Sequence, residues 1–242
     1  MVLLTRVVTI CALFGCLAPA RFAQAAYSPD VQVGDLLKFS DGPGVLNGGE
    51  FFVDNRTSNG ITANPGDFIT FCVQTNENIN FASLFRVDAI STQSVVDQNV
   101  PLASGTAYLY RRFRDGTLVM RDLALYGTGT AANHAADGDA LQQAIWYLQF
   151  GRAVTGTATQ ILDANYLISQ ANTAISSGLW SGISNVRIAN LSYATGSKTG
   201  NPAQDQLVLL PEPGSLIMWS LFGACVIGCR RFRRRQSDSA CA

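Results

Sequence analysis

The chain contains 242 residues, of which 48% are hydrophobic, and its 17 basic and 17 acidic side chains give a formal net charge of zero. This length suffices for one domain with a substantial hydrophobic core. A chain without excess positive charge is poorly suited to phosphate backbones, so nucleic acid is not expected as a partner.

The N-terminal segment has the parts of a secretory signal peptide. Arg6 precedes an apolar stretch at residues 7–18, and Ala23-Gln24-Ala25 places small residues at the two positions that a signal peptidase reads. We therefore expect residues 1–25 to be removed on export. Lipidation at Cys16 is the alternative, but the residues before this cysteine fit the lipoprotein pattern poorly.

The next part of the chain, up to residue 90, is typical of β-strands. Its apolar segments are rich in β-branched and aromatic residues, and turns rich in Gly, Asn and Pro separate them. Four strands are expected, over residues 31–39, 50–54, 67–73 and 83–90.

Helical patterns follow. The clearest one has apolar residues at helical spacing, Asp137 or Asp139 in position to cap its start, and Gly151 in position to end it. Four helices are expected, over residues 103–113, 118–126, 139–150 and 161–177.

Strand character returns at residues 185–193 and 205–210. Strands, then helices, then strands again predict an α+β domain, either a β-sandwich or a barrel with a helical insertion. We place this domain at residues 26–210.

The C-terminal segment begins with Pro211, Glu212 and Pro213 and continues with an apolar run at residues 216–229. Arginines next to an apolar segment resist translocation and stay on the cytoplasmic side of a membrane. The run has about fourteen residues, fewer than the roughly 20 of a stable spanning helix, which suits a segment that is anchored briefly and then processed. Five arginines close this run: Arg230, Arg231, Arg233, Arg234 and Arg235.

These three parts, in this order, resemble the PEP-CTERM sorting signal of exported bacterial proteins. The resemblance covers residues 211–235, followed by a short tail at 236–242. It implies an exosortase as a partner, a transient membrane anchor, and a final location at the cell surface or outside the cell.

Removing both ends changes the composition of the remaining domain. Residues 26–210 keep ten basic and fifteen acidic side chains, a net charge near −5, and one of the six cysteines, Cys72. An unpaired cysteine in an exported protein is either a reactive thiol or an intermolecular bridge. One thiolate cannot complete a zinc or iron-sulfur site, so we expect no metal and no cofactor.

Three short motifs include this cysteine. Phe71-Cys72-Val73 lies on an expected strand, Leu141–Trp146 (Leu-Gln-Gln-Ala-Ile-Trp) lies on the clearest helix, and Gln206 precedes Leu207, Val208 and Leu209 on the last expected strand. On that helix Gln142 and Trp146 are four residues apart and share one face.

Together, in this order, the motifs resemble the Cys-Gln thioester domain of bacterial surface adhesins. The resemblance implies that Cys72 is the thioester cysteine, that Gln206 supplies the acyl group, and that Gln142 and Trp146 support them. It also implies a single-use covalent bond to an amine or hydroxyl of a surface partner, without enzymatic turnover.

The sequence departs from the family pattern at two positions. Leu141 replaces the threonine of the helix motif, and Asp205 stands where an apolar residue normally precedes the late glutamine. Because of the second departure, Gln204 and Gln142 remain alternative acyl donors.

Two other functions remain open. One is a structural or carbohydrate-binding surface module with the same fold and no thioester. The other is a cysteine hydrolase with Cys72 as nucleophile and His134, the one histidine of the chain, as base. The expected position of His134 in an exposed loop argues against the hydrolase.

Overall fold

The computed structural model of the protein describes residues 30–44, 49–56, 68–77, 79–95 and 99–211. The described residues up to Leu210 belong to one compact unit. The expected signal peptide, and all of the expected sorting segment except Pro211, lie outside the described residues. Within the described part of the chain, no helix is long and apolar enough to cross a membrane.

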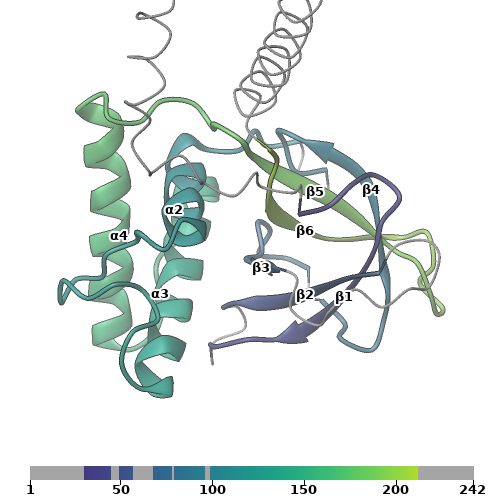
Figure 1. Cartoon of the computed structure of the whole chain (residues 1–242), viewed down its shortest axis with the longest axis horizontal. Coiled ribbons are helices and arrows are strands. Elements are labelled where there is room, and N and C mark those ends of the chain that lie inside the picture. The colour runs from purple at the N-terminus through teal and green to yellow at the C-terminus, as the bar shows by residue number, and fades with distance from the viewer. Residues whose placement is uncertain (1–29, 45–48, 57–67, 78, 96–98, 212–242) are drawn as a thin grey trace, which may run out of the picture. The chain divides into compact units, whose positions relative to one another are not determined.

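Six antiparallel strands form one sheet in the order β3-β2-β1-β4-β5-β6 (Figure 1). The exposure of the strands alternates where one face covers the core, as in β4, whose first four residues are in turn buried and exposed. The strands are β1 Leu36–Asp41, β2 Phe51–Arg56, β3 Phe68–Thr70, β4 Phe85–Ser91, β5 Val186–Tyr193 and β6 Pro202–Leu209.

The two edges of the sheet are hydrogen-bonded to each other. Beyond the end of β3, the backbone N–H of Val73 donates to Asp205 O (3.0 Å), and the N–H of Leu207 donates to Phe71 O (3.2 Å). The hydroxyl of Thr70 donates to Leu207 O (2.6 Å). A single sheet therefore closes on itself instead of facing a second sheet.

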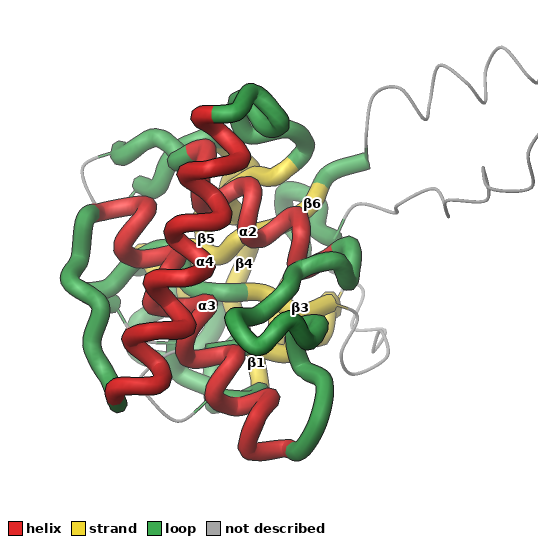
Figure 2. Tube along the Cα trace, turned by 90° about the vertical axis from the view of Figure 1, so that its left-hand side faces the viewer, coloured by secondary structure: helices red, strands yellow, loops and turns green. Residues whose placement is uncertain are grey.

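All three helices of the described chain lie between β4 and β5 in sequence: α2 Ser104–Arg114, α3 Ala131–Phe150 and α4 Ala158–Ser176. They form a layer on one side of the sheet, and Figure 2 shows this layer in front of the strands. Thr157 and Gln160 form a capping box that begins α4. The α+β expectation is confirmed.

The helix expected over residues 118–126 is wrong. Val119 and Leu125 form an antiparallel bridge, and the chain turns back between them. The Asp122 carboxylate accepts a hydrogen bond from Ala124 N (3.0 Å), and Leu123 adopts a left-handed φ of 68°. Such a side-chain bond to the backbone offers the chain an alternative to the helical ladder.

The clearest helix was expected to begin at Asp139, but α3 begins eight residues earlier. Thr130 caps it by accepting a hydrogen bond from Asn133 N. Neither proposed aspartate is the cap: Asp137 accepts from Gly127 N (2.9 Å), and Asp139 accepts from the amide of Gln160 (2.9 Å).

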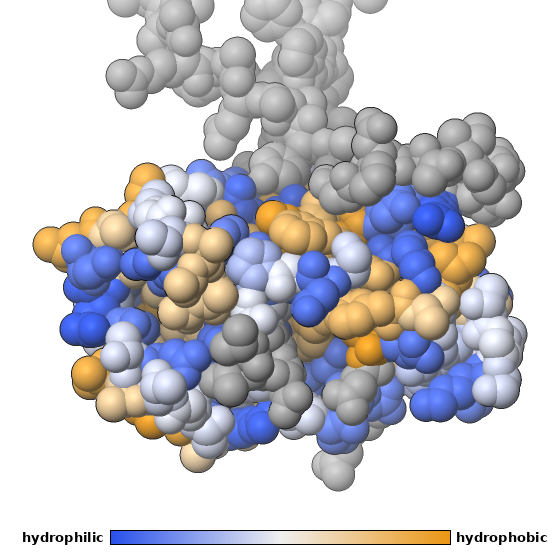
Figure 3. Space-filling model, turned by 90° about the horizontal axis from the view of Figure 1, so that it is seen from below, coloured by the Kyte–Doolittle hydropathy of each residue, from blue (hydrophilic) through white to orange (hydrophobic). Residues whose placement is uncertain are grey.

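One buried apolar cluster draws side chains from all six strands and Trp146 from α3, and the rings of Phe39 and Phe85 pack edge to face within it. Figure 3 shows one face of the surface, on which apolar residues lie in separate patches among polar ones. Isolated exposed apolar residues are common on soluble domains. This surface therefore does not by itself identify a binding site.

Candidate functional site

Cys72 and Gln206 face each other where the two edges of the sheet meet. They form an antiparallel bridge, although 134 positions separate them in sequence. The amide Nε2 of Gln206 lies 3.6 Å from Cys72 Sγ, and both residues are 1% exposed. The closed sheet thus places a thiol against a side-chain amide in a site shielded from water.

The Gln206 amide is only lightly held. Its Nε2 also contacts Gln204 O at 3.4 Å, whereas its buried Oε1 has no hydrogen-bond partner among the described residues. Since the amide C–N bond is about 1.33 Å long, the amide carbon is within about 5 Å of the sulfur. An amide carbon at this distance needs only a small side-chain adjustment to come within reach of the thiol.

Gln142 of α3 holds the backbone of Cys72 at both of its polar groups. Its Oε1 accepts from Cys72 N (3.0 Å), and its Nε2 donates to Cys72 O (2.8 Å). The resemblance implied a supporting role for Gln142, and the hydrogen bonds of its side chain are to the backbone of the cysteine. Gln142 therefore fixes the cysteine relative to the helix.

Trp146 lies one helical turn further along α3 and covers the same segment. Its indole N–H donates to Gln74 O (3.1 Å), and it belongs to the same buried cluster as Cys72. The guanidinium of Arg152 lies over its ring, 4.6 Å from the centroid. Trp146 is therefore part of the buried surroundings of Cys72, with Arg152 stacked on its ring.

The alternative acyl donors make other contacts. The Gln204 amide donates to Gln74 O (3.0 Å), and the Gln142 amide is bonded to the backbone of Cys72. Of these three glutamines, Gln206 is the one whose amide nitrogen contacts the sulfur.

Burial dominates the electrostatics of the site. Desolvation raises the pKa of Cys72 to about 12, although the hydrogen bond from Gln206 lowers it somewhat. Desolvation also raises the pKa of Asp205 to about 6, against the hydrogen bonds from Val95 N, Asn190 and Leu191 N. Because its pKa is raised to about 12, the Cys72 thiol is protonated at neutral pH.

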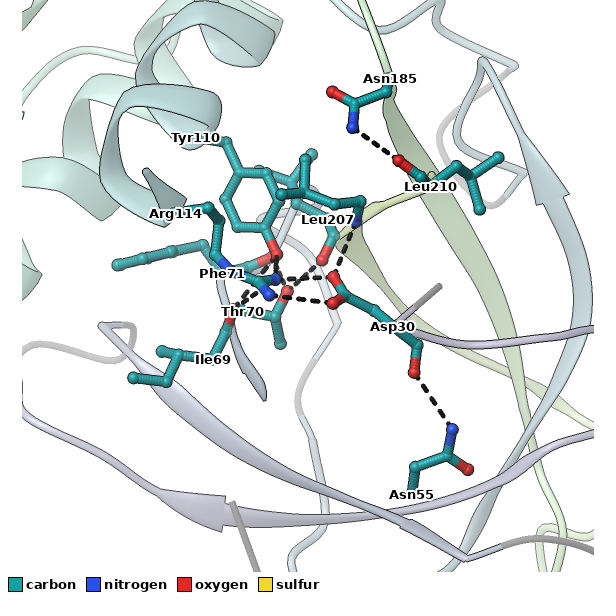
Figure 4. A network of polar contacts seen from close by, with 11 residues as sticks. Asp30, Asn55, Ile69, Thr70, Phe71, Tyr110, Arg114, Asn185, Leu207 and Leu210 are labelled. Atoms are coloured by element: carbon teal, nitrogen blue, oxygen red, sulfur yellow. Dashed lines mark hydrogen bonds and ion pairs between the residues drawn. The ribbon is translucent and has the colours of Figure 1, made fainter. Parts of the chain in front are cut away.

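A second polar network joins both ends of the compact unit next to the site (Figure 4). The Asp30 carboxylate accepts two hydrogen bonds from Arg114 (2.6 and 2.9 Å) and one from Leu209 N (2.8 Å). Arg114 also donates to the hydroxyl of Tyr110, which in turn donates to Ile69 O. The network ties Asp30, α2 and β3 to the end of β6.

The last described residues are held as well. The amide of Asn185 donates to Leu210 O (2.5 Å), and Leu210 N donates to Asn185 O (3.0 Å). Pro211 follows directly, whereas the other residues named for the expected sorting signal, Glu212, Pro213, Arg230 and Arg231, lie outside the described residues.

His134 lies in the first turns of α3 and not in an exposed loop, so the sequence-based placement was wrong. Its Nε2 is 2.6 Å from Glu50 Oε1, which also accepts from the hydroxyl of Tyr126 (2.6 Å). His134 precedes Gln142 by eight residues, or about 12 Å along the helix axis. The structure pairs this histidine with Glu50 and gives no contact between it and Cys72.

Sequence reasoning missed Gln74, Glu50 and Asp30, all of them polar and buried. Gln74 had a readable signal, because it follows Cys72 by two residues in an extended segment and can share its face. In the described ranges, no three His, Cys, Asp or Glu residues are grouped so that they could hold a metal.

Comparisons with protein-family models, with curated proteins and with solved structures found no match.

Proposed function

We propose that this protein is exported, sorted to the cell surface by its C-terminal segment, and attached covalently to a partner through a Cys72–Gln206 thioester. The observation that carries the proposal is the 3.6 Å contact between the Cys72 sulfur and the Gln206 amide in a buried site. The motif order and the sorting-signal resemblance support the surface location.

The chemistry balances without a cofactor. The Cys72 sulfur attacks the amide carbon of Gln206, the C–N bond breaks, and ammonia leaves with the thiol proton. A side-chain amide is a poor electrophile in water, but well-oriented neighbours can gain roughly 7–11 kcal/mol from proximity. The buried, closed sheet supplies that proximity.

The thioester is a stored electrophile. An amine or hydroxyl of the partner attacks the acyl carbon, the C–S bond breaks, and the Cys72 thiol is regenerated. The partner keeps an amide or ester bond to Gln206. Each molecule reacts once, so the protein is an adhesion or matrix component and not an enzyme.

Methylamine labelling tests this proposal. The amine should add once per folded molecule, at Gln206, and should free the Cys72 thiol. Cys72→Ser should take up none. Peptide mapping that locates the adduct at Gln204 or Gln142 would contradict the assignment of the acyl donor.

A second candidate function is a surface module without the thioester. The raised pKa of Cys72 favours it, because a protonated thiol is a weak nucleophile. A shallow groove of about 350 Å³ between α2 and α4 suits a neutral ligand such as a carbohydrate. It is lined by Tyr108, Tyr166, Ser169, Gln170, Thr173, Ala174 and Leu179. Full unmodified mass with no methylamine adduct would favour this candidate.

A further inference from the structure

Gln74 is completely buried and joins the two segments that carry Cys72 and Gln206. Its side-chain oxygen accepts from Asp205 N (2.8 Å), and its amide nitrogen donates to the Asp205 carboxylate (3.2 Å). Both ends of one amide thus bind the residue that directly precedes Gln206.

The two bonds between Gln74 and Asp205 add to the backbone hydrogen bonds that hold Gln206 beside the Cys72 segment. Both backbone polar groups of Asp205 are bonded: its N–H donates to the Gln74 side chain, and its carbonyl oxygen accepts from Val73 N (3.0 Å). On the other side of Gln206, Leu207 N bonds Phe71 O (3.2 Å). The register that places Gln206 opposite Cys72 therefore depends on a short ladder, of which Gln74 forms the end.

The same residue connects the ladder to α3. The carbonyl of Gln74 accepts from Trp146 Nε1 (3.1 Å) and from Gln204 Nε2 (3.0 Å). One residue thus contacts the helix that holds Cys72 and two residues on the strand of Gln206.

The side chain of Asp205 is hydrogen-bonded in turn to β5 and to the segment at Val95. Its carboxylate accepts from Val95 N (2.9 Å), Asn190 Nδ2 (3.0 Å) and Leu191 N (3.3 Å). The β5–β6 pairing changes register between Ala189 and Leu191, so the carboxylate fills this irregularity. Because these bonds fix the position of Asp205, the bonds between Gln74 and Asp205 can fix the position of the Gln74 segment relative to β6.

We propose that Gln74 is a positioning residue that acts through Asp205 to keep Gln206 in register with Cys72, and so sets the rate of thioester closure. This inference rests on the proposed function. Gln74 touches neither the sulfur nor the Gln206 amide in the contacts of the structure, so its effect is one of placement. Displacements of about 1 Å can cost about a hundredfold in such reactions.

The test follows closure directly. Excess ammonia should reopen the thioester of the full-length protein to the Gln206 amide and the Cys72 thiol. Removing the ammonia then starts closure, which intact-mass measurement follows as the return of the ammonia loss. Gln74→Met should close at least about tenfold more slowly than the wild type.

Gln149→Met is the matched control. Gln149 is also buried, and its amide also binds backbone at both ends, to Ala103 N (2.9 Å) and Pro101 O (2.8 Å). It should lose stability to a similar degree and keep the wild-type closure rate. Equal slowing in both variants, or wild-type closure in Gln74→Met, would overturn the inference and leave the proposed function standing. A wild type that never loses ammonia would overturn both.

Gln74→Glu provides a second readout if the methionine variant does not fold. An ionised carboxylate in place of the Gln74 amide has no donor and faces the Asp205 carboxylate, with Glu77 as a further acidic neighbour. A protonated carboxyl at the same position restores one donor and one acceptor. The closure rate of this variant relative to the wild type should therefore rise as the pH is lowered. A ratio that does not change with pH would contradict the positioning role.

Discussion

Cys72 and Gln206 are poor reactants individually, and their surroundings decide whether they combine. Burial keeps the thiol protonated, which slows attack, but it also excludes the water that would hydrolyse a thioester. Gln142 fixes the backbone of the cysteine, whereas the Gln206 oxygen has no partner among the described residues. One reactant is therefore held firmly and the other can still adjust.

The pH dependence of stability should show the state of Asp205. Its folded pKa of about 6 lies above its ordinary value of 3.8, so the folded protein binds the proton more tightly than the unfolded chain. Stability from this group is full below about pH 4 and falls as pH rises to about 6, by about 3 kcal/mol in all. The difference in the free energy of urea unfolding between the wild type and Asp205→Asn should therefore change mainly between these pH values and level off outside them.

Only the pH dependence of that difference is diagnostic, because Asp205→Asn also places an NH₂ group among several donors. A difference in unfolding free energy that stays constant from about pH 4 to about pH 7 would contradict the raised pKa of this carboxyl.

Single residues were predicted unevenly from the sequence. Cys72 emerged because it is the one cysteine between the two chain ends that the sequence predicts to be removed. Gln74 did not, because a buried glutamine in an extended segment is read as an ordinary polar residue until its partner is known. Its partner, Asp205, is 131 positions away.

At the scale of elements, strands and long helices were readable, whereas boundaries and turns were not. β-branched and aromatic runs located the strands, and helical spacing located α4. The turn at Asp122 was misread because its Leu-rich sequence also suits a helix, and the deciding hydrogen bond is local and polar. The early start of α3 depends on the cap at Thr130, ahead of a run of alanines.

The buried ion pair between Asp30 and Arg114 should contribute more to the free energy of unfolding than the exposed ion pairs do. Their side chains are 5% and 11% exposed, so removal of one partner leaves a buried charge. Asp30→Ala should lower the free energy of unfolding by about 3–5 kcal/mol. Urea denaturation measures this loss.

Asp88→Ala is the matched control for the buried pair. Asp88 pairs with Arg86 at 2.8 Å, but these side chains are 43% and 54% exposed. Its removal should cost less than about 1 kcal/mol. Similar losses in the two variants would mean that burial does not make the Asp30–Arg114 pair more important for stability than an exposed pair.

For the whole molecule, the decisive feature is the closure of the sheet. The contact between β3 and β6 joins segments that are far apart in the sequence, with the whole helical layer between them. Local patterns cannot specify such a contact, because they report periodicity and not pairing. The order of three short motifs gave the only sequence-level indication that Cys72 and Gln206 belong together.

The closure of the sheet also places the site on the strand that leads to Leu210, the last residue of the compact unit. Gln206 lies on the strand that ends at Leu209, and Asn185 and Asp30 hold that strand end. In the proposed function, the segment after Leu210 directs the protein to the surface, so the reactive bond would sit close to the sorting junction in sequence.

The intact mass of the purified, folded protein is the decisive test of the thioester. We expect a molecule lighter by one ammonia than its processed sequence requires, with the loss abolished in Cys72→Ala. A wild-type protein of full mass, whose Cys72 thiol is alkylated stoichiometrically after unfolding, would contradict the thioester.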